Sequence, residues 1–198
     1  VTEYVFQVLQ NSNFGQEAHE AFLDLAVGTG CILVEEGDAL NPIRFNAIPL
    51  PQLVLENGAD DRIDHVYRQR EVRNSDILIA YPNAVLSQMM MDKIIKAPDV
   101  KTQIIEVVCR LYTKPNQEVN AYYVICKETK ELIFKDVFEG AGSSPFVCFR
   151  WSKASGEVYG RGPLVNSLSA IKTTNLTIAL VLENAQIAIS GIYQIDHD

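Results

Sequence analysis

A long stretch near the C-terminus constrains this fold more than any other feature of the sequence. After Pro163 the chain runs to about Ser190 without another proline or glycine. Apolar side chains recur there at alternating spacings of four and three residues, a heptad seam with one polar interruption. The seam positions are Leu164, Leu168, Ile171, Asn175, Ile178, Leu182, Ala185 and Ile189. The pattern predicts one helix of about 27 residues and about 40 Å, a length typical of helices that pack against other helices, often from other chains.

A membrane-spanning helix is an alternative for this stretch. Residues 173–182 and 184–193 are nearly uncharged. Lys172 and Glu183 lie inside the predicted helix, however, and polar side chains are scattered along it. No run of about 18 residues therefore has the apolar character of a bilayer span. We expect a packed helix with no membrane contact, and a membrane-anchored binding module that uses residues 173–193 is the weaker reading.

The residues before this helix carry short helical and strand patterns. Apolar spacing predicts helices over residues 2–10, 16–27 and 84–96, and a further helix that Asn74–Asp76 caps and Pro82 interrupts. Breaks are expected at Asn11–Gly15 and Gly28–Gly30. The β-rich runs predict strands at 31–36, 44–50, 52–57, 63–72, 103–114, 119–128, 130–139 and 145–151.

Turn signals indicate how these strands connect. Residues 57–62 form a predicted turn that starts with Asn-Gly, and residues 140–144 form a flexible link. The three runs after residue 103 predict an antiparallel meander, joined at Pro115-Asn116 and by a tight turn at Lys127–Lys130. The sequence thus predicts an α+β fold: a strand-rich domain with short helices over 1–160, a long helix over 161–191 and a further segment over 192–198.

Composition limits the classes of partner. The 198 residues carry a formal net charge of −8, which disfavours tight binding to phosphates but allows DNA to slide past without sticking. The start of the chain lacks the pattern of a secretory signal and opens directly into apolar periodicity, which suggests a piece of something longer. We expect reduced, mostly buried thiols of a cytosolic protein at the four cysteines Cys31, Cys109, Cys126 and Cys148.

Signatures of catalysis or of cofactor binding are weak. The Gly28-Thr29-Gly30 motif follows a helix and precedes a strand, the reverse of a phosphate-binding loop, so we read it as a turn. His19, His65 and His197 are scattered and lack metal-ligand spacing. Acidic residues cluster at Glu35-Glu36-Asp38 and Asp60-Asp61-Asp64, mostly at predicted turns. Because carboxylates can hold a catalytic metal ion, a metal-dependent nuclease or hydrolase is the alternative function. We expect no enzyme activity, no metal and no cofactor.

The segment that leads into the long helix is the most informative. Several glycines surround a tyrosine and an arginine directly before the helix, which indicates a tight strand-to-helix elbow. Trp151 and Tyr159 are expected to anchor the elbow by burying their rings, although an ordinary loop is an equal reading from the residues alone. The elbow residues are Trp151, Gly156, Tyr159, Gly160, Arg161, Gly162 and Pro163.

The same segment carries a family resemblance. The motif RW, four residues and then GEVYGRGP (150–163), followed by a long helix with the pair Asn175-Leu176, resembles the portal, or head-to-tail connecting, proteins of short-tailed phages. The upstream motifs agree in order over nearly the whole chain. They are SNF (12–14), HEAFLDLAV (19–27), GTGCILVEE (28–36), FNAIPLPQLVLE (45–56) and IDHVYRQREV (63–72).

The resemblance implies a structural role. Members of this family form rings, usually of twelve subunits, at one vertex of the capsid, and double-stranded DNA passes through them without sequence recognition. Residues 1–160 resemble the wing, the helix from Pro163 resembles the first stem helix, and Gly191-Ile192-Tyr193 resembles the entry to the clip. The implied partners are sister subunits, the packaging terminase, capsid and scaffolding proteins and tail adaptors. The implied location is the virion, after assembly in the host cytoplasm.

One hypothesis about the helix follows from its charges. Arg161, Lys172 and Glu183 recur every 11 residues, about 20° from three full turns, and would share one stripe on a continuous helix. That stripe would face a neighbouring subunit or the channel. A solvated face with isolated charges is an equally good reading.

Overall fold

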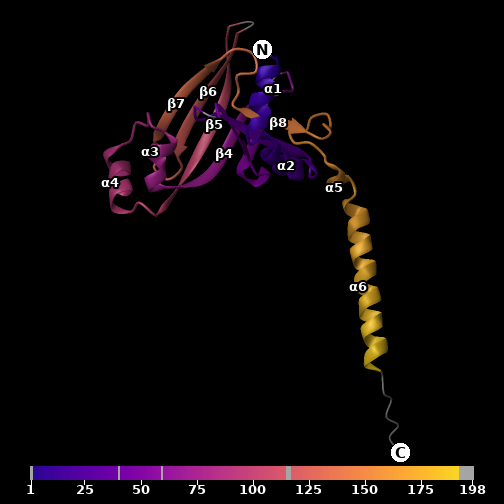
Figure 1. Ribbon diagram of the computed structural model, residues 1–198. Helices are drawn as coiled ribbons and strands as arrows, with labels where there is room; N and C mark the ends of the chain where they lie inside the picture. The colour runs from indigo at the N-terminus through magenta and orange to yellow at the C-terminus, as the bar shows by residue number, and fades with distance from the viewer. Residues whose placement is uncertain (1, 40, 59, 115–116, 192–198) are drawn as a thin grey trace, which may run out of the picture.

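The structure is a computed structural model that describes all residues except 1, 40, 59, 115–116 and 192–198. Figure 1 shows a body of sheets and short helices from which one long helix projects. The described strands form a three-stranded sheet in the order β2-β1-β8 and a five-stranded sheet in the order β3-β4-β5-β6-β7, with every pairing antiparallel. The predicted mixture of helices and strands is confirmed, whereas the segment 192–198 lies outside the described residues.

The element bounds are as follows. The helices are α1 (Thr2–Asn11), α2 (Phe14–Leu25), η1 (Leu50–Gln52), η2 (Asn74–Asp76), α3 (Ile77–Ala80), α4 (Gln88–Lys96), α5 (Pro163–Asn166) and α6 (Leu168–Ser190). The strands are β1 (Thr29–Glu36), β2 (Ile43–Ala47), β3 (Leu53–Asn57), β4 (Ile63–Arg73), β5 (Lys101–Lys114), β6 (Gln117–Cys126), β7 (Leu132–Glu139) and β8 (Phe146–Arg150).

The three-stranded sheet lies between α2 and the larger sheet. Ala18 and Ala21 of α2 pack against Ile32 and Phe45 on one side. On the other side, Cys31 and Leu33 of β1 and Phe146 of β8 pack with Leu53, Leu55, Val66 and Val108 of the larger sheet. Because β1 is covered on both faces, residues Thr29–Leu33 are all buried, which explains its continuous apolar run.

The five-stranded sheet contains the predicted meander. Strands β5, β6 and β7 pair in sequence order, and β3 and β4 extend the sheet on the other side of β5. Lys130 N–H donates to Cys126 O at 2.9 Å in the tight turn before β7, as predicted, and the Pro115-Asn116 connection lies outside the described residues. A second core, which includes Ile77, Tyr81 and Met90 from the α3–α4 region, covers the part of this sheet around Ile104 and Val124.

Several predicted boundaries are wrong for local reasons. The break after α1 is only Ser12–Asn13, because the Asn13 side chain accepts from Phe45 N–H at 3.0 Å and donates to Phe45 O at 2.7 Å, which pins the chain to β2. The predicted strand 44–50 ends at Ala47, because Pro49 precedes η1 and Pro51 lies inside it, and proline cannot continue the strand pairing. The predicted helix 84–96 starts at Gln88, because Ser87 Oγ caps it by accepting from Met90 N–H at 3.3 Å.

Two further predictions need correction. Thr29 and Gly30 belong to β1, so the turn that ends α2 is Ala26–Gly28, two residues earlier than the predicted Gly28–Gly30. The helix predicted from Pro163 to Ser190 is two helices, because Ser167 leaves the helical region at φ −93° and ψ 2°. The short first part, α5, is held to the body by Leu164 N–H, which donates to Ala26 O at 3.1 Å, whereas no residue of α6 is buried. The break therefore separates an anchored turn from a projecting rod.

A buried charge network joins the two cores of the larger sheet. Glu106 on β5 is 1% exposed and its carboxylate meets two guanidinium groups: Arg68 Nη1 donates to Oε2 at 3.2 Å, and Arg70 Nε forms an ion pair with Oε1 at 2.8 Å, without hydrogen-bond alignment. Tyr81 OH donates to Oε1 at 2.6 Å. Burial, and then the Glu106 charge, raise the pKa of Tyr81, so the hydroxyl keeps this proton.

Candidate functional site

The elbow, residues 150–163, joins β8 to α5 and is bound to the end of α2 and the start of β1. Its backbone follows that of the earlier segment through three hydrogen bonds: Trp151 N–H to Gly28 O at 2.9 Å, Gly162 N–H to Val27 O at 2.8 Å and Leu164 N–H to Ala26 O at 3.1 Å. Gly160 N–H also donates to the buried Thr29 Oγ1 at 2.8 Å. The base of the long helix is therefore fixed by main-chain bonds to residues 26–29.

Glycines make this close approach possible. A Cβ added to Gly28 would lie 2.0 Å from Gly160 O, and one added to Gly160 would lie 2.2 Å from Gly28 O. A Cβ on Gly162 would lie 2.2 Å from Ala26 O and 2.5 Å from Val27 C. Because the obstructing atoms belong to backbone, a side chain at these positions would force the two segments apart.

Sequence reasoning found only half of this contact. It placed Gly160 and Gly162 in the elbow but treated the Gly-Thr-Gly motif at 28–30 as an isolated turn. The structure packs one Gly-x-Gly motif against the other, about 130 residues away along the chain. The signal that could have revealed this is the presence of two glycine-rich motifs, each at a helix–strand boundary.

The two aromatic residues of the elbow behave differently from each other. The Trp151 side chain is 60% exposed, so the expectation that its ring is buried is wrong for the described residues. Tyr159 is 38% exposed, but its hydroxyl accepts from Leu55 N–H at 3.2 Å and donates to Leu53 O at 3.4 Å. Tyr159 thus ties the elbow to strand β3 through its polar end.

The remaining elbow residues shape the loop itself. Gly156 has φ +79°, a conformation that favours glycine. Arg161 Nε donates to Glu157 Oε2 at 2.9 Å, and Arg150 Nη1 donates to Val158 O at 3.0 Å. Pro163 occupies the first position of α5, where its missing N–H costs nothing. These contacts stabilise the loop from within.

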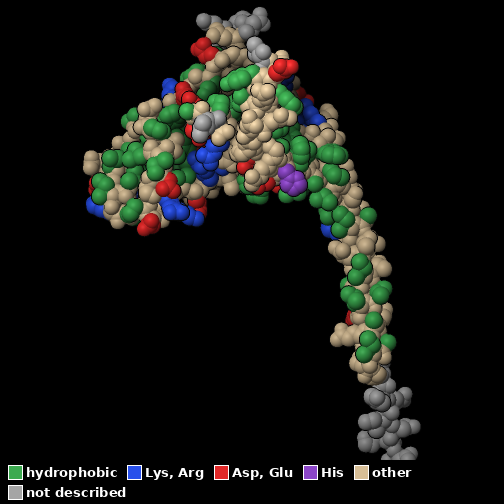
Figure 2. All heavy atoms as spheres, in the orientation of Figure 1, with side chains coloured by type: hydrophobic (Ala, Val, Ile, Leu, Met, Phe, Trp, Pro, Cys, Tyr) green, Lys and Arg blue, Asp and Glu red, His purple; other side chains and the backbone are tan. Residues whose placement is uncertain are grey.

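The rod beyond the elbow presents an apolar surface to its surroundings. Every residue of α6 is exposed, including the seam residues Leu168, Ile178 (52%) and Leu182 (64%). Figure 2 shows hydrophobic side chains along the length of this rod. Among the described helices, none combines the length and hydropathy needed to cross a bilayer.

The three threonine hydroxyl groups of α6 are hydrogen-bonded inside the helix. Thr173 Oγ1 donates to Ser169 O at 3.1 Å, Thr174 Oγ1 to Ala170 O at 2.9 Å and Thr177 Oγ1 to Thr173 O at 3.0 Å. Such bonds remove the need for water at these side chains. The rod can therefore pack against another apolar surface without leaving these donors unpaired.

The predicted charge stripe is only partly present on one helix. Lys172 and Glu183 both belong to α6 and share a face, because 11 residues make about three turns. Arg161 lies before α5, is separated from α6 by the break at Ser167, and pairs with Glu157. Because Arg161 precedes the first helical residue, Pro163, only Lys172 and Glu183 are placed on one face of one helix.

The acidic turns do not assemble a metal centre among the described residues. Asp60 lies 3.5 Å from Arg62 and 3.8 Å from Arg110, Asp64 lies 3.4 Å from Arg110, and Asp61 pairs with Lys153. Nowhere in the described part of the chain do three His, Cys, Asp or Glu side chains lie suitably for a metal ion, and His197 falls outside that part. The nuclease alternative therefore gains no support from these turns.

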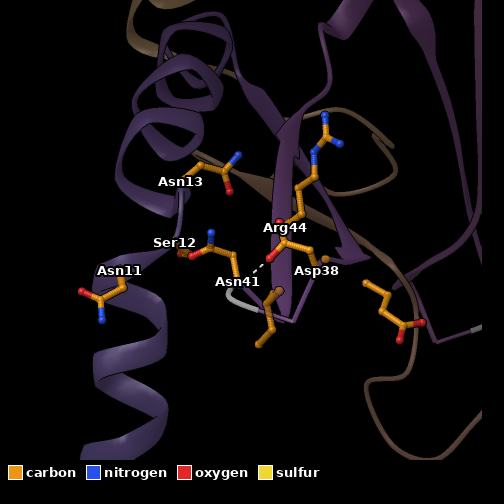
Figure 3. A pocket seen from close by; sticks show the side chains of 9 residues that line it. Asn11, Ser12, Asn13, Asp38, Asn41 and Arg44 are labelled. Atoms are coloured by element: carbon orange, nitrogen blue, oxygen red, sulfur yellow. Dashed lines mark hydrogen bonds between the residues drawn. The ribbon is translucent and has the colours of Figure 1, made fainter.

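One open hollow of about 670 Å³ lies between the α1–α2 junction and the β1–β2 connection (Figure 3). Its side chains are mostly polar, and Asp38 Oδ1 accepts from Asn41 N–H at 2.7 Å. It is lined by Asn11, Ser12, Asn13, Glu36, Gly37, Asp38, Asn41, Ile43 and Arg44. The bonds of Asn13 and Asp38 to backbone groups serve to hold this corner of the fold together.

The variant Gly162→Ala should loosen the elbow. Its Cβ would overlap the backbone at Ala26 and Val27, so the hydrogen bonds of Gly162 and Leu164 to the turn after α2 should break, at a cost of about 1–3 kcal/mol. Hydrogen exchange at these two amides measures the effect, and at least a tenfold acceleration is expected.

Gly15→Ala is the matched control, because that glycine lies in α2 with no atom within 4 Å of the added Cβ. It should stabilise the helix slightly. Equal exchange rates at the elbow in both variants would refute the close-packing account.

The chain matches a known family over its full length. A family model described as bacteriophage head to tail connecting protein matches residues 1–198. No curated protein matches the chain.

Proposed function

Because the chain belongs to the bacteriophage head-to-tail connecting protein family, we propose that it forms a ring whose shaft is built from copies of α6 and through which DNA passes. Membership makes the protein a phage connector and a component of the virion, where it meets head and tail components. The ring, its usual twelve-fold size and the short-tailed class of phage are the proposed refinements. In this proposal residues 1–160 form the wing and α6 is the first stem helix.

The observation that carries the proposal is the exposed apolar rod. Nine large apolar side chains of α6 are between 38% and 87% exposed, and none of its residues is buried. Burying a Leu or Ile side chain contributes about 1.5–3 kcal/mol, so an uncovered row of them favours association. A heptad seam is the pattern by which one helix packs against another, and copies in a ring supply such partners on both sides.

The proposed channel is a passive conduit. An acidic subunit, at a formal net charge of −8, makes few persistent contacts with DNA phosphates, which favours sliding in both packaging and ejection. We assign the protein no catalytic step and propose that the terminase motor supplies the force. Further proposed partners are capsid and scaffolding proteins during assembly in the host cytoplasm, and tail adaptors afterwards.

The direct test combines the size of the assembly with an activity assay. Electron microscopy and size-exclusion light scattering of the purified protein should show rings with a central hole. A nuclease assay with Mg²⁺ should show no cleavage of duplex DNA. A monomer that cleaves DNA would replace this proposal with the metal-dependent nuclease, and association only in detergent would favour a membrane-anchored module.

If Lys172 faces the channel, the variant Lys172→Glu should reduce the DNA content of capsids. The change replaces an attractive charge beside the phosphates with a repulsive one at every subunit of the ring. Lys135→Glu, on the exposed edge strand β7, is the matched control and should leave packaging unchanged. DNA content is measured by quantitative hybridisation of purified capsids. Equal DNA content in the two variants would show that Lys172 does not face the channel.

A further inference from the structure

Two cysteines that are distant in the sequence face each other across the small sheet. Cys31 on β1 is directly opposite Cys148 on β8 in the antiparallel register. Their sulfur atoms are 3.2 Å apart, with Cys148 Sγ donating to Cys31 Sγ. Cys31 belongs to the core between the two sheets, and Cys148 packs against that core. All four cysteines are free thiols; Cys126 is buried like Cys31, whereas Cys109 and Cys148 are half-buried.

The hydrogen-bond pattern places this pair at the closer type of cross-strand position. Val34 N–H donates to Pro145 O at 2.8 Å, and Trp151 N–H donates to Gly28 O at 2.9 Å. Bonded and non-bonded pairs alternate along antiparallel strands, and the cysteine pair is three positions from each of these bonded pairs. It is therefore a non-bonded pair, whose Cα atoms lie about 4.5 Å apart, inside the range of about 4.4–6.8 Å that disulfides require.

We propose that Cys31 and Cys148 form a modification site, which a low-molecular-weight disulfide such as oxidised glutathione converts into a cross-strand disulfide. The site does not depend on the proposed ring or channel. The juxtaposition of two thiols at a non-bonded pair is what favours it, since neither strand has to shift register for the sulfur atoms to bond.

Exposure sets the order of the exchange steps. Cys31 is 0% exposed and its pKa is raised, first by its contact with the neighbouring Cys148 thiol and then by burial, so it is a poor first nucleophile. The half-buried Cys148 loses its proton to solvent and its thiolate attacks one sulfur of oxidised glutathione. A mixed disulfide forms, and one glutathione thiolate leaves and takes up a proton.

The second step closes the bond. Cys31 loses its proton and attacks Cys148 Sγ, which breaks the mixed disulfide and releases the second glutathione as a thiol. In sum, the two cysteine thiols are oxidised by two electrons and one glutathione disulfide is reduced to two thiols. A virion component is exposed to oxidising surroundings once it leaves the cell, so the reduced pair belongs to assembly and the oxidised pair to the released particle.

The cross-link would strengthen the root of the elbow. It ties β8, which continues into Trp151 and the elbow, to β1, and it joins residues 117 positions apart. Closing so long a loop restricts the unfolded chain strongly. The oxidised protein should therefore unfold at a temperature about 10 °C higher than the reduced protein.

The test is oxidation of the folded, purified protein by glutathione buffers of graded ratio. Two of the four thiols should be lost, the mass should fall by two hydrogens, and peptide mapping should find Cys31 joined to Cys148. Cys109→Ser should oxidise in the same way, whereas Cys148→Ser should keep its remaining thiols. Because mapping of the unmodified protein carries the result, poor folding of Cys148→Ser does not remove the test.

Three outcomes would overturn the site. They are retention of all four thiols under strongly oxidising ratios, a cross-link that involves Cys109 or Cys126, and a mixed disulfide that persists at Cys148. None of these outcomes bears on whether the protein forms rings, so failure of this inference and failure of the proposed function are separable.

Discussion

Two negative charges placed on the seam of α6 should leave the protein folded and monomeric. The double variant Ile178→Glu, Leu182→Glu changes side chains that are 52% and 64% exposed in a single chain, so the single chain should keep the circular dichroism spectrum of the folded protein. In a ring each interface loses two apolar side chains, which removes about 3–6 kcal/mol of association free energy per interface. Light scattering should therefore show single chains where the unmodified protein shows rings.

The matched control carries the same two charges on the opposite side of the rod. Thr173 and Asn184 are polar residues of α6 that lie roughly 140–240° around the helix from the seam residues Ile178 and Leu182. The variant Thr173→Glu, Asn184→Glu should still assemble. Assembly of the seam variant would show that this face does not join subunits, and disassembly of both variants would show that charge anywhere on the rod is sufficient.

The variant Glu106→Gln should lower the free energy of unfolding by about 3–5 kcal/mol. It keeps the shape of the side chain but removes the charge that balances Arg68 and Arg70 in the core of the larger sheet. Arg68 is only 6% exposed, so water cannot solvate its guanidinium charge once the carboxylate charge is lost. Urea unfolding followed by circular dichroism measures the loss, which should appear as a lower midpoint with an unchanged slope.

A surface ion pair provides the control for this experiment. Glu128 lies 2.7 Å from Lys93, and its side chain is 54% exposed. Glu128→Gln should cost at most about 1 kcal/mol, because water screens the pair and solvates the remaining charge. Similar losses in the two variants would show that the buried network contributes no more than a surface pair.

The predicted and observed folds agree where the determining contacts are local. The meander β5-β6-β7 was predictable because each strand has β-rich composition and the turn at Lys127–Lys130 is short. The rod was predictable because its apolar spacing is continuous and contains no proline or glycine. The break at Ser167 was missed, since nothing in that spacing reveals that α5 is bonded to the end of α2.

The candidate site was only partly visible in the sequence. The glycines predicted a tight elbow, but the segment against which it packs begins at Ala26, 136 residues before Gly162. The aromatic residues were misjudged for a related reason. Tyr159 binds β3 through its hydroxyl, and Trp151 remains exposed. Composition cannot show which groups the fold brings within reach of an aromatic side chain.

The amino-acid sequence by itself determined the helices and strands with strong periodicity, the acidic balance and the apolar seam, because each of these depends on composition or on neighbours a few residues apart. Only the tertiary structure decided that β8 pairs with β1, that the two Gly-x-Gly motifs touch, that Cys31 meets Cys148 and that Glu106 lies between two arginines. These contacts join residues far apart along the chain, and long-range pairing leaves no local period from which it could be predicted.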